Sequence, residues 1–139
     1  LFDDYEEGTF SVSATIASGS LAISGSFNLL SYTKIGKRVF ISGGVRLADA
    51  SAGGSPSGAV NLDDLPFTPA SASEDEMHSC FFVAHDSMTG MSAQPMIGQI
   101  LPGNVNIFLF TQDASGFADC GNHFTDNSIL RFNFSYLAA

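Results

Sequence analysis

The densest group of side chains that could bind a small ligand lies between residues 112 and 127. This segment carries amides, carboxylates and an imidazole beside one aromatic ring, namely Gln112, Asp113, Phe117, Asp119, Asn122, His123, Asp126 and Asn127. Such polar groups bond to sugar hydroxyls, and an aromatic face can cover the apolar surface of a sugar ring. We therefore predict that this segment binds a glycan.

The segment has two interpretations, which differ in whether the ring of Phe117 is exposed or buried. It lies between a glycine and an alanine, where no alternation of apolar residues buries it, so one interpretation leaves its ring exposed for ligand contact. In the other interpretation, the segment folds over the end of the domain and Phe117 closes the core. The loop at 85–94, with Met88 and Met91, is a second candidate because flexible methionines adapt to partners.

Two cysteines and two histidines have spacings that could supply metal ligands. His78 and Cys80 lie two residues apart, hence on one face of a strand, and Cys120 and His123 form a second pair. A Zn²⁺ site with two ligands of each type is one interpretation. The favoured interpretation makes Cys80 a small core residue and the second pair a coincidence, so we predict no metal and no cofactor. A disulfide would require the two cysteine Cα atoms to lie within about 7 Å, and we expect free thiols instead.

Sequence patterns typical of catalysis are absent. The chain contains no G-x-S-x-G elbow that would expose a nucleophilic serine. Its acidic residues form no recognisable glycosidase pair, and nothing near Cys120 and His123 in the sequence would activate a thiol. We predict that the chain is not an enzyme.

The charge balance narrows the choice of partners. The formal net charge is −9, with only five lysines and arginines in 139 residues. A surface of this sign repels phosphate, so we predict no binding to nucleic acid. No run approaches the roughly 18 apolar residues of a membrane helix, so we also predict no membrane insertion.

The elements that must position these residues are predicted to be strands, because apolar residues recur with a period of two and no segment has a helical period. The predicted strands are 10–16, 21–29, the two arms of a hairpin that turns at Gly36, 59–62, 78–85, 95–101, 104–111 and 129–136, with loops at 48–58, 68–76 and 112–128. Eight or nine strands at about ten-residue spacing predict an all-β fold, an antiparallel β-sandwich with jelly-roll-like connections. At this length we expect one domain, 1–139.

Alternation also assigns faces to the predicted strands. In 21–29 the apolar face would hold Leu21, Ile23, Phe27 and Leu29. After the turn at Gly36 it would hold Val39, Ile41, Val45 and Leu47, and in the last strand Leu130, Phe132, Phe134 and Tyr136. These three faces are the predicted walls of the core.

Three short segments in fixed order carry a family resemblance. Residues 2–10 read FDDYEEGTF, residues 32–47 read YTKIGKRVFISGGVRL, and residues 62–67 read LDDLPF. Together they resemble the C-terminal domain found on many bacteriophage tail fibres and tailspikes. The resemblance implies a homotrimer at the tip of the virion's tail fibre or tailspike, assembled in the bacterial cytoplasm, that binds a host-surface polysaccharide.

The same resemblance suggests how the domain is attached. Residues 1–8 would be a lead-in from an upstream fibre or spike shaft, with Tyr5, Tyr32 and Lys34 at the junction between shaft and trimer. Lys34, Lys37 and Arg38 either pair with the acidic stretch at 3–7 or form a hydrated turn. Two alternatives to receptor binding stay open: a trimerisation and stability cap without receptor contact, and part of a polysaccharide depolymerase.

Overall fold

A computed structural model describes residues 4–50, 55–71, 78–91, 94–113 and 115–139 of the chain. Its strands are β1 (Tyr5–Ser11), β2 (Ser13–Ser18), β3 (Ala22–Ile23), β4 (Leu29–Ile35), β5 (Arg38–Asp49), β6 (Ser57–Asp63), β7 (Ser79–Asp86), β8 (Met96–Ile100), β9 (Ile107–Asp113), β10 (Gly116–Asp119) and β11 (Ile129–Leu137). A short 3₁₀ turn, Gly121–His123, precedes the last strand. Within the described residues no helix is long and apolar enough to cross a membrane.

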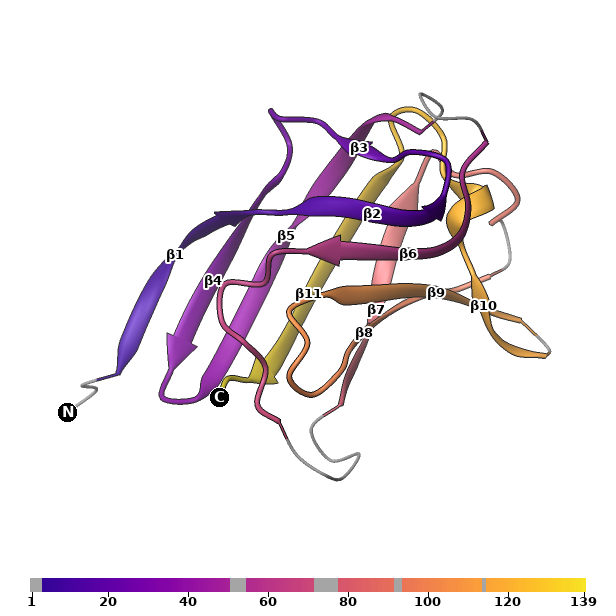
Figure 1. The fold of residues 1–139 in the computed structure, drawn as a ribbon. Helices are drawn as coiled ribbons and strands as arrows, with labels where there is room; N and C mark the ends of the chain where they lie inside the picture. The colour runs from indigo at the N-terminus through magenta and orange to yellow at the C-terminus, as the bar shows by residue number, and fades with distance from the viewer. Residues whose placement is uncertain (1–3, 51–54, 72–77, 92–93, 114) are drawn as a thin grey trace.

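The strands form two layers that continue into each other. Hydrogen-bonded neighbours follow the order β1-β4-β5-β11-β7-β8-β9-β6-β2, with β10 added beside β9 and β3 beside β5, and every pairing is antiparallel. The strand β7 joins the layers, because its last residues pair with β11 and its first five pair with β8 (Figure 1). The predicted antiparallel β-sandwich is confirmed.

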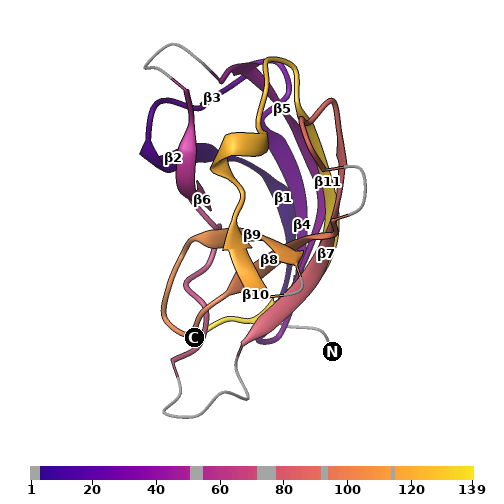
Figure 2. The ribbon, with the colours of Figure 1, turned by 90° about the vertical axis from the view of Figure 1, so that its right-hand side faces the viewer.

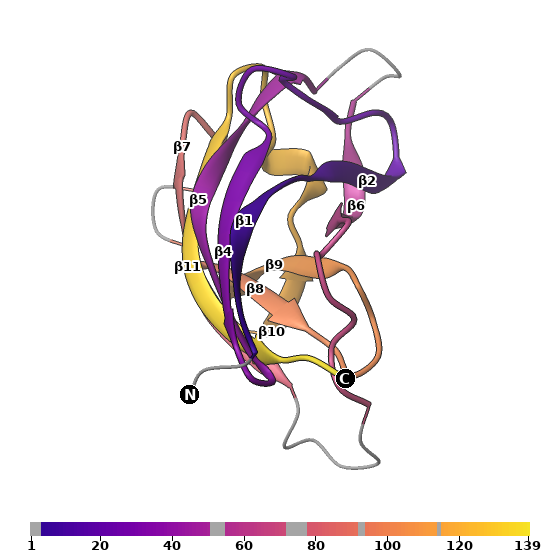
Figure 3. The same ribbon diagram turned by 90° about the vertical axis from the view of Figure 1, so that its left-hand side faces the viewer.

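Side views show the layers facing each other. Strands β4, β5 and β11 form one wall, while β2 and β6 lie across the molecule from them (Figures 2 and 3). The chain crosses between walls at β1–β2, β5–β6 and β10–β11, as connections in a jelly roll do. The space between the walls is the core.

The predicted core faces of two long strands are confirmed. On β5 the four residues Val39, Ile41, Val45 and Leu47 are at most 2% exposed, and β11 buries Leu130, Phe132, Phe134 and Tyr136. Tyr136 keeps its hydroxyl satisfied by donating to the carbonyl oxygen of Phe67 at 2.9 Å. Burial of that phenol raises its pKa to about 12.

The predicted strand at 21–29 is wrong. Only Ala22–Ile23 pair as β3, and the chain then turns, with the Phe27 amide donating to the Ser24 carbonyl. The turn ends the alternation, so Phe27 is 55% exposed and Leu29 is 60% exposed, although both were assigned to the core face.

The first strand also differs from its predicted bounds. The lead-in at 1–8 is not a separate linker in its described part, because Tyr5–Ser11 form β1 and pair with β4. The predicted strand 10–16 is divided near Val12, where the chain leaves β4 and continues as β2 beside β6. The side chains of Phe10, Val12 and Ile16 still face the core, as alternation predicted.

Both ends of the described chain lie at the turn between β4 and β5. The Gly36 amide donates to the carbonyl of Asp4 at 2.9 Å, and the Ala138 amide donates to the carbonyl of Lys37 at 2.7 Å. Gly36 has the positive φ of 58° that the sequence predicted for this turn. In Figure 1 the C-terminal marker accordingly lies beside the turn between β4 and β5.

Candidate functional site

The predicted glycan segment begins as a hairpin and not as a loop. Strands β9 and β10 pair with Phe117 opposite Gln112 and Asp119 opposite Phe110. Directly opposed residues of an antiparallel pair share a face, so these four side chains lie together on the outer side of the sandwich. The ring of Phe117 is 62% exposed and lies 5.6 Å, centroid to centroid, from that of Phe110. Phe117 is therefore a surface residue and not a core plug.

The remaining predicted glycan residues lie apart from this hairpin or are engaged in local contacts. An Asp113 carboxylate oxygen accepts from the Ser115 amide at 2.7 Å and shapes the turn of the hairpin. Asn122 and His123 lie in the 3₁₀ turn, where Nδ1 of His123 donates to the carbonyl of Thr89 at 2.7 Å.

The end of the segment has a structural role. Asp126 accepts from the Ala50 amide at 2.9 Å, and Asn127 accepts from the Arg46 guanidinium at 2.9 Å. These contacts fasten the approach to β11 onto β5. The structure thus gathers Gln112, Phe117 and Asp119 into one surface and separates them from Asp126.

The outer face of the hairpin continues across neighbouring strands as an apolar surface. By register, Phe110 lies opposite Ile97 of β8, and Ile97 lies opposite Phe82 of β7. Phe82 is 76% exposed. We call the set Phe82, Ile97, Phe110 and Phe117 the aromatic stripe. An exposed apolar patch of this kind marks an interaction surface.

The second predicted loop does not present its methionines. Met91 is 4% exposed and Met88 packs against the core, so neither is available to a partner.

The cysteines and histidines do not assemble into a metal site. Cys80 lies on the exposed side of β7, which corrects its assignment to the core, whereas Cys120 is completely buried, and both are free thiols. The Cys120 thiol donates to the Leu109 carbonyl at 3.3 Å, and burial raises its pKa to about 12. In the described part of the chain no three His, Cys, Asp or Glu side chains could hold a metal ion together.

The three segments of the family resemblance meet at one place in the fold. Strands β1 and β4 pair with Gly8 opposite Tyr32, and an added side chain at Gly8 would lie 2.9 Å from the tyrosine hydroxyl. The Tyr32 ring packs edge-on against Phe67 at 5.3 Å and near Phe10 at 6.4 Å. In this chain the three segments therefore pack into one cluster built on Gly8, Tyr32 and Phe67.

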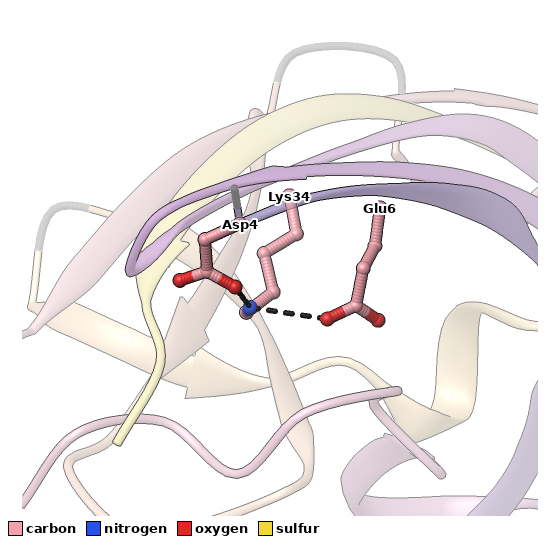
Figure 4. Close-up of polar contacts among 3 residues, drawn as sticks. All are labelled: Asp4, Glu6 and Lys34. Atoms are coloured by element: carbon pink, nitrogen blue, oxygen red, sulfur yellow. Dashed lines mark hydrogen bonds and ion pairs between the residues drawn. The ribbon is translucent and has the colours of Figure 1, made fainter. Parts of the chain in front are cut away.

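Lys34 holds the acidic strand to the same cluster. Its Nζ lies 2.7 Å from an Asp4 carboxylate oxygen and 3.2 Å from one of Glu6, as Figure 4 shows, and 5.5 Å from the centre of the Phe67 ring. The hydrogen bond with Asp4 is the main cause that raises the pKa of Lys34. For Lys34, pairing with the acidic stretch is therefore the correct alternative, within one chain.

Tyr5 lies at the edge of this predicted junction. It is half exposed, and its hydroxyl donates to Glu7 at 2.6 Å, which raises the pKa of the phenol. Of the three predicted junction residues, Tyr32 and Lys34 thus pack inside the chain and Tyr5 remains at the surface. Whether a shaft contacts them stays a prediction.

A hollow on the described surface lies elsewhere, on β5 and β11. It encloses about 490 Å³ and is lined by Phe27, Gly44, Arg46, Ile129 and Arg131, among others. Sequence reasoning missed it, because Arg46 and Arg131 are 85 positions apart along the printed sequence and meet only through the register that places Ile129 opposite Arg46. We call this feature the arginine hollow.

Comparison with known proteins gives one informative result. No protein-family model matches the chain, and no curated protein matches it. A solved structure does match: the crystal structure of Dettilon tailspike protein, with a TM-score of 0.79 at 19% sequence identity. The chain has the fold of a tailspike domain. The match covers 95% of this chain but 23% of the tailspike chain, so the chain spans about a quarter of that protein's length.

Proposed function

We propose that this chain is a non-catalytic, carbohydrate-binding module of a phage tailspike or tail fibre, located at the tip of the virion and directed at a host-surface polysaccharide. The main support for this proposal is the outer face of the β9–β10 hairpin, where Phe117 is 62% exposed and lies beside Gln112 and Asp119. A ring with an amide and a carboxylate at its edge suits a sugar, whose ring has apolar faces and a rim of hydroxyls. The tailspike-like fold supports the phage setting of the proposal.

The proposed mechanism is multivalent binding, in which several weak sites contact the same polysaccharide. A shallow surface such as this hairpin buries little of a ligand, so each site would bind weakly. Three copies in a homotrimer would raise the overall affinity by about 10² to 10⁴ without any new contact.

Replacement of Phe117 by alanine tests the proposal. We expect binding of the wild-type chain to at least one polysaccharide in a panel of bacterial surface polymers, and loss of most of that binding in Phe117→Ala. Because the ring is mostly exposed and touches chiefly Phe110, the free energy of unfolding should change by no more than about 1 kcal/mol.

The matched control is Phe40→Ala. Phe40 is a similarly exposed phenylalanine, at 45%, but it lies on the outer face of β5 in the other wall. Full binding by Phe117→Ala, or equal losses in both variants, would contradict a glycan site on the hairpin. A wild-type chain that binds no polymer in the panel would overturn the carbohydrate-binding proposal itself.

A second candidate function is favoured by the other end of the aromatic stripe. Phe82 is 76% exposed on the outer face of β7, and a ring so exposed is suited to burial against a second copy of the chain. On that basis the domain would be a trimerisation and stability cap. A chain that forms trimers and binds no polymer would support this candidate.

The depolymerase alternative is tested by incubation alone. If this chain lowers the viscosity of a polysaccharide solution, the module is catalytic and the non-catalytic proposal fails.

A further inference from the structure

The arginine hollow forms where strand β4 stops pairing with strand β5. Strand β4 pairs with β5 only as far as Leu30 opposite Gly43, and the chain before it bends away. That chain returns to β5 through hydrogen bonds between the Ser24 amide and the Arg46 carbonyl and between the Arg46 amide and the Phe27 carbonyl. The detour leaves the outer face of β5 open beside Phe27. Its volume of about 490 Å³ lies within the usual range for small-ligand sites.

Two unneutralised cations line this space. Only five residues of the chain are lysine or arginine, yet Arg46 and Arg131 both belong to the hollow. Within the described residues neither has a carboxylate at ion-pair distance, since the ion pairs found there both belong to Lys34. Asp86, two strands away from Arg46 on the same face, accepts from the Ser87 amide.

The two arginines differ in how they are held. Arg46 is positioned by its hydrogen bond to Asn127 and by the Phe27 ring, whose centre lies 5.7 Å from the guanidinium carbon. In the described part of the chain, no hydrogen bond or ion pair engages the exposed Arg131 side chain. Two arginines that line one hollow suit an anionic group, because a guanidinium fork can donate two hydrogen bonds to a carboxylate or a phosphate.

The floor of the hollow requires a glycine. A side-chain carbon added to Gly44 would lie 2.6 Å from the Leu130 carbonyl oxygen and 3.1 Å from Cγ of Arg131. The bare backbone at Gly44 therefore leaves room for the Arg131 side chain beside β5, where it lines the hollow. Sheet register, a glycine and a ring thus combine into one built site.

We propose that the arginine hollow binds the acidic group of a sugar, with Arg46 and Arg131 on the anion and Phe27 against the sugar ring. The inference rests on the proposed carbohydrate-binding function and names the class of ligand. The net charge of −9 repels anions from most of the surface, and the hollow combines two cations with an aromatic ring that can contact the sugar. The hairpin with Asp119 would take neutral units of the same polymer.

Binding of three small probes to the full chain, followed by NMR chemical-shift titration, tests this inference. The probes are methyl β-glucuronide, which carries a carboxylate, glucose 6-phosphate, which carries a phosphate, and methyl β-glucoside, which is neutral. We expect the charged probes to shift signals of the β5 and β11 segments and to bind at least about tenfold more tightly than the glucoside. Whichever of the two charged probes binds more tightly shows whether the hollow prefers a carboxylate or a phosphate.

Arg131→Gln is the main variant, because that side chain engages no partner in the described chain and its loss should leave the melting temperature unchanged. Arg131→Gln and Arg46→Gln should each weaken the charged probes by about tenfold or more. The matched control is Arg38→Gln, which removes an exposed arginine from the other end of β5. Arg38→Gln should bind the probes as the wild type does.

Several outcomes would overturn the inference and leave the proposed function intact. These are equal binding of glucuronide and glucoside, unchanged binding by Arg131→Gln, or equal losses in Arg38→Gln, while a neutral polysaccharide still binds through Phe117. Failure of every polysaccharide to bind overturns the proposed function instead. Shifts confined to the hairpin on addition of glucuronide would also reject the hollow as the site.

Discussion

At the scale of single residues, burial gives the two thiols opposite chemistry. Cys80 is exposed on β7, and Cys120 is enclosed beneath β9 with its thiol bonded to the Leu109 carbonyl. The pKa of Cys120 is about 12, so at pH 8 this thiol is protonated as well as inaccessible.

We predict that a thiol reagent at pH 8 labels one cysteine per native chain and two per chain in denaturant. Cys80→Ser should remove the native label completely, because Cys120 reacts only after unfolding. Mass spectrometry of the labelled protein gives the count. Two labels on the native chain would mean that the interior around Cys120 opens to solvent.

At the scale of elements, the pairing of β7 with β8 depends on one small residue. Gly98 lies opposite Phe81, whose ring covers it, and an added side-chain carbon would approach that ring to 2.4 Å. The ring also stacks on Phe134 of β11, with centroids 4.1 Å apart and planes 12° apart. A side chain at position 98 would therefore displace the Phe81 ring from this stack.

We predict that Gly98→Ala lowers the free energy of unfolding by about 1 to 3 kcal/mol, because the added carbon overpacks against the Phe81 ring. The control is Gly25→Ala, at a position where an added carbon meets nothing within 4 Å. That variant should be neutral or slightly stabilised through loss of entropy in the unfolded chain. Chemical denaturation of both variants measures the difference, and equal effects would contradict the packing argument.

The elements also show what the sequence could predict and what it could not. Long alternating strands such as β5 and β11 were predicted correctly, because burial of one face requires a period of two. Alternation failed at 21–29, where a turn stabilised by the Ser24 carbonyl exposes Phe27. It also missed β10, whose four residues are too few to show a period.

For the candidate sites too, the local sequence indicated some features, whereas others depend on contacts between distant residues. Exposure of Phe117 was one of two interpretations that its small neighbours left open, and the structure shows the ring exposed. Of the polar residues predicted at 112–127, register places Gln112 and Asp119 on the face of Phe117, whereas Asp126 accepts a hydrogen bond from Ala50. Arg46 and Arg131 were missed because strand register depends on contacts between distant residues, which a linear pattern does not contain.

At the scale of the whole molecule, the exposed rings on the outer walls are the feature to be explained. Rings as exposed as Phe82, at 76%, are costly to leave in water and favour association between chains. The sequence resemblance implied a homotrimer. In such an assembly each of the three chains would bury its exposed rings against a neighbouring chain.

We predict that light scattering coupled to size-exclusion chromatography gives the mass of three chains, and that Phe82→Ser shifts the species toward monomer. Little change in the secondary structure is expected, because Phe82 faces outward and its neighbour Phe81 holds the core contact. A monomer at about 100 μM of the unmodified chain would reject the trimer, since association depends on concentration.

The meeting of both chain ends at the β4–β5 turn has a practical consequence for orientation. The turn begins β5, and the Arg46 end of that strand is eight residues onward, about 26 Å away along the sheet. A biotin tag, bead or sensor chip coupled at the C-terminus would therefore leave the guanidinium pair facing the solution. Chains tethered at that end should retain full access for analytes that use the pair.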